Sequence, residues 1–265
     1  MNRRSSISIE VDASNPGQFL ACCGLLELAD RLWRGAEGWF ESRRFRFALP
    51  DSVEGSLDLL LEEICKVPMK QVDLEDDYSS PVYVEKPFDL QLDWWMDTRA
   101  GGNRLKVWAG TMRSVRIAMA MRAALRDKEF WGESLLNRGM VVFDPEEPDK
   151  KVEPYYFDSR RGNNAQSRDI GFATDALQMT TAAYPAVEFL CLVGLQRFRP
   201  LPTHKSRVFE YCAWDIPCVP EIAGVMACGL GGTSNAPRYR FENAFRTDQK
   251  KHKAFLPATL IGEHS

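Results

Sequence analysis

The stretch from Ser5 to Arg34 restricts the fold more than any other part of this 265-residue chain. Ser5–Val11 alternates between polar and apolar residues, a pattern that predicts a β-strand. Asn15 then offers a helix N-cap, Pro16 suits the first helical position, and Gln18 completes a capping box. A strand followed by a helix of about 17 residues is therefore expected.

The polar residues of this expected helix occupy one narrow stripe. They recur at i, i+3, i+4 and i+7, as Glu27, Asp30, Arg31 and Arg34. The rest of the surface is apolar: Phe19, Leu20, Leu25, Leu26, Leu28 and Leu32. Because so wide an apolar surface has to be covered, we expect the helix to pack against a sheet.

Strands and helices continue to alternate along the chain. Strands are predicted at 44–47, 88–94, 140–143, 155–157 and 207–214, and helices at 56–66, 110–126, 184–198 and 219–229. This order indicates the α+β class, and a ferredoxin-like or RNA-recognition-type core with insertions fits it. We interpret residues 1–265 as a single elaborated domain. Its insertions are placed at about 67–87 and 144–170, which are rich in charge and Pro or Asn and have little apolar periodicity.

Composition narrows the class of protein. Apolar residues make up 45% of the chain, enough to fill a large core, and no run of 18 uncharged apolar residues occurs. The N-terminus, Met1-Asn2-Arg3-Arg4, leads into polar residues rather than a hydrophobic signal segment. The seven cysteines are an odd number, mostly within apolar stretches, as a reducing compartment permits. A cytoplasmic globular protein is expected.

Charge is distributed in blocks. Segment 51–97 contains thirteen Asp or Glu against three Lys, a formal charge of −10, whereas segment 98–126 contains seven Lys or Arg and no acid, a formal charge of +7. The whole chain has a net charge of only −3. Phosphate recognition depends on local clusters of cations, so the basic block is a candidate nucleic-acid site despite the acidic total.

The expected helix in the basic block divides its residues between faces. Spacing at 100° places Trp108, Met112, Val115 and Met119 on a buried stripe, which Arg122 and Arg126 extend to the helix C-terminus, where the macrodipole favours cations. Arg113 and Arg116 fall on another face with Ala109, Ala120 and Ala124, where a phosphate chain could approach closely. The alternative is a solvated helix whose arginines pair with the acidic block before it.

Two further segments have a composition suited to single-stranded RNA. Arg160, Arg161 and Arg168 occur with Asn163, Asn164 and Gln166 after an aromatic run, Tyr155–Phe157, that could stack on bases. The alternative is a loop held by local salt bridges. Near the C-terminus, the basic residues are Arg238, Arg240, Arg246, Lys250, Lys251 and Lys253. The predicted RNA-binding residues are Arg104, Lys106, Arg113, Arg116, Arg160, Arg161, Arg168, Lys250 and Lys251.

The sequence gives little evidence for a catalytic site, a metal site or a cofactor site. The three histidines are His204, His252 and His264, and of these only His252, among lysines, could act on a phosphodiester. The acidic run 73–77 is typical of a solvated loop, and His204, Cys212, Cys218 and Cys228 lack the C-x-x-C spacing of a zinc site. The glycine-rich stretch 228–235 suits either a phosphate loop or a helix C-cap. We predict no cofactor, no metal and no enzyme activity.

Three strings resemble proteins of type I-U (I-G) CRISPR systems: Asn15–Trp33, Pro154–Gly162 and Ala183–Pro200. The resemblance implies a subunit of an RNA-guided, Cascade-like effector complex that binds guide RNA (crRNA) and neighbouring subunits, with target DNA as a further candidate ligand. Family members often have a glycine-rich loop near the C-terminus, and here only residues 228–235 could supply it. Two alternatives stay open: a protein-interaction scaffold without nucleic-acid contact, and a repeat-RNA processing endoribonuclease. An enzyme acting on a small molecule would need a pocket that the sequence does not locate.

Overall fold

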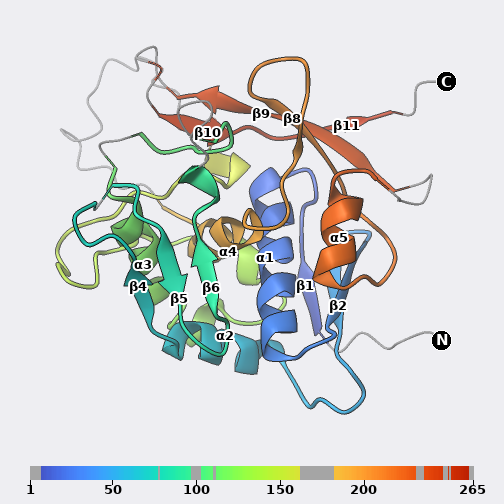
Figure 1. Ribbon diagram of the computed structural model, residues 1–265, viewed down its shortest axis with the longest axis horizontal. Helices are drawn as coiled ribbons and strands as arrows, with labels where there is room; N and C mark the ends of the chain where they lie inside the picture. Colours follow the sequence, from blue (N-terminus) through green and yellow to red (C-terminus); the bar gives the residue numbers. More distant parts are fainter. Residues whose placement is uncertain are drawn as a thin grey trace.

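Three antiparallel sheets surround a central pair of helices in the computed structural model (Figure 1). The structure describes residues 7–76, 78–96, 103–109, 112–161, 182–230, 236–246, 250 and 252–262. This mixture of helices and small antiparallel sheets confirms the predicted α+β class.

The first sheet and its helix form as the N-terminal sequence predicts. β1 (Ile7–Glu10) is followed by α1 (Pro16–Leu32), whose N-cap Asn15 accepts hydrogen bonds from Gly17 N and Gln18 N. Gln18 does not complete a capping box, because its Oε1 accepts from Asp12 N at 2.7 Å. The sheet has the order β1-β3-β2, with β2 (Glu37–Glu41) and β3 (Arg44–Ala48) forming a hairpin of which only β3 was predicted. Phe45 and Phe47 face inward against Ile9 and Ile7.

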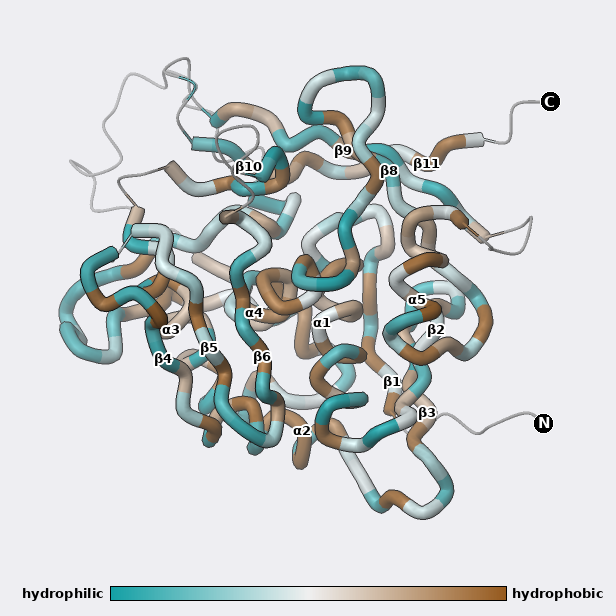
Figure 2. Tube along the Cα trace, in the orientation of Figure 1, coloured by the Kyte–Doolittle hydropathy of each residue, from teal (hydrophilic) through white to brown (hydrophobic). Residues whose placement is uncertain are grey.

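α1 and α4 (Pro185–Gly194) touch backbone to backbone. A Cβ added at Gly24 would lie 2.0 Å from the carbonyl oxygen of Leu190, and one added at Gly194 would lie 2.1 Å from that of Leu20. α4 is buried along its whole length, and the tube in Figure 2 is largely brown there. Glycine at both positions thus allows two helices with almost no polar surface to share the centre of the core.

The second sheet lies in a segment that the sequence assigned to an insertion. β4 (Met69–Gln71), β5 (Val82–Val84) and β6 (Leu90–Leu92) pair antiparallel in that order. Residues 67–87 therefore contain two strands, too short to show periodicity. The predicted strand 88–94 is reduced to β6, because a 3₁₀ turn begins at Trp94. α2 (Leu57–Lys66) forms close to its predicted bounds, with Ser56 as its N-cap, and contacts both α1 and α3.

The third sheet has the order β10-β9-β8-β7, with β11 also paired to β9. Its strands are β7 (Leu201–Pro202), β8 (Val208–Cys212), β9 (Arg238–Phe245), β10 (Lys253–Phe255) and β11 (Thr259–Ile261). Only β8 was predicted. The predicted strands at 140–143 and 155–157 are wrong: the first makes isolated bridges, and the second is buried, irregular chain in which Tyr156 has φ +73°.

α5 (Pro220–Ala227) ends in a Schellman motif. Gly229, at φ +73°, donates from its N–H to Met226 O, and Leu230 N donates to Val225 O. The start of the glycine-rich stretch is therefore a helix C-cap, whereas residues 231–235 lie outside the described part of the chain.

α3 (Ser114–Ala124) begins later than predicted and turns a different side to the core. Trp108 and Val115 are buried as expected, but Met112 and Met119 are only half-buried. Trp108 and Met112 precede the helix, so the helical spacing used in the prediction does not apply to them. Ala120 is fully buried, whereas Ala109 and Ala124 are half-buried, so the face expected to admit a phosphate chain beside Arg113 and Arg116 is covered at Ala120. Contacts of α3 with both α2 and α4 explain the wider buried surface. Short 3₁₀ turns follow it at Lys128–Phe130, Leu135–Asn137 and Ser159–Arg161. Within the described ranges, no helix combines the length and apolar character needed to cross a bilayer.

The helix contact predicts a large effect from a small substitution. Gly24→Ala should lower the free energy of unfolding by about 3 kcal/mol or more, because the methyl group collides with backbone, which cannot rotate away. Gly224→Ala in α5 is the matched control: its added Cβ would meet nothing closer than 3.5 Å, so it should be neutral or stabilise by about 0.5–1 kcal/mol through helix propensity. Urea unfolding measures both, and equal stabilities would contradict the contact.

Candidate nucleic-acid interface

A pocket of about 550 Å³ opens beside the start of α3. Three separate segments supply its walls: the start of α3, the loop 144–153, and the end of the β9–β10 hairpin. Its charged lining residues are Arg113, Arg116, Asp144, Lys150, Lys151, Glu153, Arg246 and His252. Five Lys or Arg against two acids give a formal charge of +3 with His252 neutral.

A second pocket, of about 670 Å³, lies against the outer face of the first sheet but is balanced in charge. Arg43, Arg44 and Arg46 line it together with three acids, Glu10, Asp12 and Glu41. Arg46 forms an ion pair with Glu41, and Arg44 Nη1 lies 2.9 Å from Glu133 Oε2. The lining of the smaller pocket has the larger excess of positive charge, so the smaller pocket is the better nucleic-acid candidate.

Arg116 is the most strongly compensated cation of the basic pocket. Its guanidinium lies 2.7 Å from Glu147 Oε1, 3.3 Å from Asp144 Oδ2 and 3.8 Å from Glu146 Oε2. These carboxylates raise the pKa of Arg116, and its charge in turn lowers the pKa of Asp144. The arginine does pair with acids, as the alternative interpretation expected, but they come from the loop 144–147 and not from the block 51–97.

Arg246 lies over an aromatic floor. Its guanidinium is 3.4 Å from the ring centroid of Tyr156, whose hydroxyl donates to Glu153 Oε2 at 3.1 Å. Burial raises the pKa of Tyr156 to about 12, although the charges of Arg246 and Arg161 act in the opposite direction. The Nε atoms of both arginines are buried and have no hydrogen-bond partner in the described structure. Arg246 lines the pocket, with its Nη2 3.8 Å from Glu153 Oε2, whereas Arg161 acts on Tyr156 from outside the lining.

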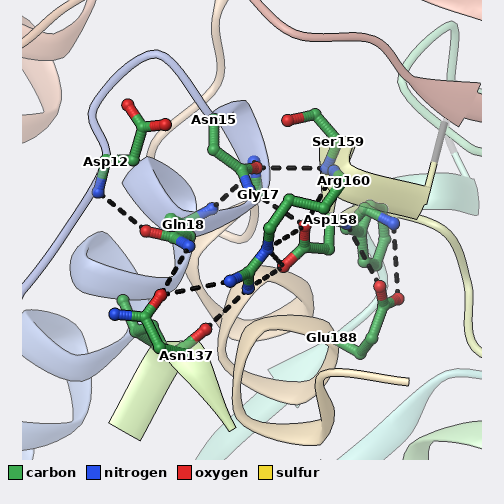
Figure 3. Close-up of polar contacts among 11 residues, drawn as sticks. Asp12, Asn15, Gly17, Gln18, Asn137, Asp158, Ser159, Arg160 and Glu188 are labelled. Atoms are coloured by element: carbon green, nitrogen blue, oxygen red, sulfur yellow. Dashed lines mark hydrogen bonds and ion pairs between the residues drawn. The ribbon is translucent and has the colours of Figure 1, made fainter. Parts of the chain in front are cut away.

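Asn15 ties the segment before Arg161 to the start of α1 (Figure 3). Besides capping α1, its Oδ1 accepts from Ser159 N at 3.1 Å, and its Nδ2 donates to Asp158 Oδ1 at 2.9 Å. A Cβ added at Gly17 would lie 2.3 Å from Phe157 O, so the two segments are in direct contact. Residues 155–161 are therefore held in place by the same helix end that the sequence predicted.

Arg160 belongs to this network rather than to the pocket. Its Nη2 lies 2.6 Å from Asp158 Oδ2, which is fully buried, and also donates to Leu136 O at 2.7 Å. Its Nη1 donates to Asn137 Oδ1, and the guanidinium is 3.5 Å from the ring centroid of Tyr184. Because these contacts occupy its donors, Arg160 is a positioning residue, as the salt-bridge alternative expected.

Glu188 supports the same segment from α4. Its two carboxyl oxygens accept from Phe157 N at 3.3 Å and Asp158 N at 3.1 Å. The side chain is fully buried, and burial, with the neighbouring charge of Asp158, raises its pKa to about 8. Folding therefore favours the protonated form of this group over much of the neutral range.

The other predicted residues do not line the pocket. Arg104 and Lys250 are exposed, Lys106 is half-buried with its Nζ 5.1 Å from the Trp108 ring centroid, and Arg161 borders Tyr156. Arg168 and Lys251 lie outside the described residues. The expected base stacking on Tyr155, Tyr156 and Phe157 is wrong, because all three side chains are buried.

Sequence reasoning missed Lys150 and Lys151 and left Arg246 out of the predicted site. Lys150 and Lys151 lie in a segment that was interpreted as an insertion. Arg246 and His252 come together because β9 and β10 pair, with Arg246 N donating to His252 O at 2.8 Å. The alternation of polar and apolar residues from 238 to 245 could have revealed this hairpin.

The candidate metal residues do not converge. In the described ranges, no group of three or more His, Cys, Asp or Glu could hold a metal ion. In the acidic run, Asp73 and Asp76 accept hydrogen bonds from backbone N–H groups of their own loop, as a solvated turn does.

No known protein family, curated protein or solved structure matches the sequence. The resemblance to type I-U CRISPR proteins therefore stays a prediction. Function has to be argued from the pocket itself.

The buried carboxyl of Glu188 predicts a pH-dependent stability. Its folded pKa of about 8 exceeds the ordinary value of 4.5, so the folded state binds more protons between these limits and loses stability as pH rises through them. The slope contributed by one such group is at most about 1.4 kcal/mol per pH unit. Urea unfolding at pH 5 to 9 should show this decline in the wild type and a flatter profile in Glu188→Gln. Parallel profiles for the two proteins would contradict it.

Proposed function

We propose that this protein is a non-catalytic RNA-binding subunit of a type I CRISPR effector complex in the cytoplasm. It binds the backbone of the guide RNA and contacts neighbouring subunits, and target DNA is a further candidate ligand. The observation that supports this most is the pocket at α3, where three segments distant in sequence contribute cations to one surface of formal charge +3.

The chemistry of the pocket suits phosphates rather than bases. Lysine and arginine side chains neutralise phosphodiester charges and release counterions without reading sequence. Arg246 rests on Tyr156 and keeps an unused Nε donor, which is a preorganised arrangement for an anionic oxygen. A guide-RNA subunit has to bind any spacer sequence, so backbone contacts are the ones it needs.

The fold supports a ferredoxin-like core. β1 and β2 both pair antiparallel with β3, so they run parallel to each other on either side of it, and α1 connects them. This is a split β-α-β unit, the first half of the ferredoxin-like arrangement. α4 lies against α1 where the second helix would lie. We assign the RNA-recognition-type core on this basis, with the other two sheets as additions.

Removing charge from the exposed rim of the pocket should weaken RNA binding. In the triple variant Arg113→Gln, Lys150→Gln and Lys151→Gln, the affinity for a single-stranded RNA should fall at least about tenfold. The slope of log K against log salt should become shallower by about 2, since each lost phosphate contact contributes about 0.7. Arg116 is left intact because its ion pairs hold the loop 144–147. Fluorescence anisotropy at several salt concentrations measures both quantities.

The matched control removes three exposed lysines elsewhere: Lys66→Gln, Lys70→Gln and Lys86→Gln. It should leave both affinity and salt slope within twofold of the wild type. If both triple variants weaken binding equally, the pocket is not the site. If the wild type binds no RNA but assembles with partner subunits, the scaffold alternative replaces the proposal.

One observation favours an endoribonuclease as a second candidate: His252 lines the basic pocket. The acids that line the pocket with it are engaged by other partners: Asp144 pairs with Arg116, and Glu153 Oε2 accepts from the Tyr156 hydroxyl. His252 Nδ1 lies 3.2 Å from Met112 Sδ, and Tyr156, with a pKa of about 12, is a poor base. A 2′-hydroxyl attack needs both a base and an acid. We therefore expect purified protein to leave repeat RNA and single-stranded DNA uncut, with or without magnesium. Specific cleavage that disappears in His252→Ala would establish the second candidate instead.

A further inference from the structure

The β9–β10 hairpin has a second basic face, opposite the pocket. Lys253 pairs with Phe245, and Phe255 with Asn243, so these four side chains share one face of the two strands. His252 and Ala254 lie on the other face, where Ala254 packs on Tyr156 and His252 contacts Met112. Lys253 is therefore directed away from the pocket that contains Arg246.

Hydrogen bonds around Asn243 bring the main chain of two more basic residues beside this face. Asn243 N donates to Arg207 O at 2.9 Å, and Asn243 Nδ2 donates to Arg104 O at 2.8 Å and Lys106 O at 3.4 Å. Lys253 N donates to Val107 O at 2.9 Å. The segments of Lys106, Arg207 and Lys253 thus meet at one buried asparagine, where the charges of Arg207 and Lys106 act on Lys253.

The three cations are incompletely compensated. Burial and the charges of Arg207 and Lys106 lower the pKa of Lys253 to about 8, and burial lowers the pKa of Lys106. The acids that face the cluster are Glu242, whose Oε1 is 3.7 Å from Arg207 Nη2, and Asp76, whose charge acts on Lys106. Like charges held together at a half-buried site destabilise one another, and a bound anion relieves that repulsion.

An unused donor occurs at the same place. Arg207 Nε is buried and has no hydrogen-bond partner in the part of the chain described. Arg207 also has φ +60°, a conformation uncommon for a residue with a side chain, and its guanidinium lies 4.6 Å from the Phe245 ring centroid. A buried donor without a partner needs an acceptor, and an anionic oxygen would supply one.

We propose that Lys106, Arg207 and Lys253 form a binding site for a phosphate monoester, separate from the pocket at α3. Three cations match a dianion better than the single charge of a phosphodiester, so the ligand is a terminal phosphate rather than an internal one. It comes either from the end of an RNA or from a free nucleoside monophosphate. The proposal goes beyond RNA backbone binding and does not depend on it, since a mononucleotide can test it alone.

Two binding measurements test the site and distinguish the sources. Isothermal titration with adenosine monophosphate, with adenosine as the reference, reports the mononucleotide arm. Anisotropy with short RNAs that carry a phosphate or a hydroxyl at the 5′ or 3′ end reports the RNA arm. A preference for phosphate of about tenfold or more in either arm supports the site, and the arm that shows it identifies the source. No preference in both arms overturns the proposal, whatever the affinity for internal phosphates.

Substitutions test whether the cluster of Lys106, Arg207 and Lys253 causes the preference for phosphate. Lys253→Met keeps the aliphatic stem and removes a repelled charge, so it should fold and should abolish the phosphate preference. Lys66→Met, at an exposed lysine of α2, should preserve it. If Lys253→Met retains the full preference, the assignment is wrong.

A pH series on the wild type provides a test that needs no variant. Raising the pH from 7 to 9 should lower the phosphate preference about tenfold as Lys253 loses its proton, while the phosphate stays a dianion throughout. A preference that does not change with pH would contradict the role of Lys253.

Discussion

The backbone contact between α1 and α4 is the constraint on which the rest of the structure depends. Gly24 and Gly194 let the helices approach until backbone meets backbone, so the largest apolar surfaces of the chain cover each other. The first sheet then packs on α1, the second sheet is anchored where Trp94 Nε1 donates to Leu192 O of α4 at 3.2 Å, and α3 rests on α4. A small increase in helix separation would disturb all three layers at once.

The same two helices hold the polar segment 155–161. Asn15 at the start of α1 and Glu188 in α4 bond its backbone from two sides, and both are buried. A buried polar network is stable only when its members are satisfied, and here each carboxylate has N–H donors. The same segment contains Tyr156 in its left-handed conformation, so the core packing determines the position of the ring on which Arg246 lies.

Charge in this protein is organised in space rather than along the chain. The basic block does not face the acidic block as a unit: Arg116 pairs with the loop 144–147, whereas Arg122 donates to the backbone of Val67. An excess of positive charge remains in the pocket where the start of α3 meets the end of the β9–β10 hairpin. The proposed backbone site and the proposed phosphate site lie on opposite faces of that hairpin.

The amino-acid sequence by itself determined the features that rest on local chemistry. Asn15 and Pro16 begin α1, the narrow polar stripe makes that helix central, and the strand–helix order gives the α+β class, because capping and periodicity are properties of neighbouring residues. Only the tertiary structure decided which arginines remain at a surface. Arg160 pairs with buried Asp158, and Ala120 is covered by the core. Lys150, Arg246 and Lys253 contribute to the basic faces instead. Ion pairing and burial depend on segments that lie far apart in sequence, so the sequence alone could not predict these outcomes. The short strands of the second and third sheets escaped prediction for the same reason, since three residues show no period until their partners are known.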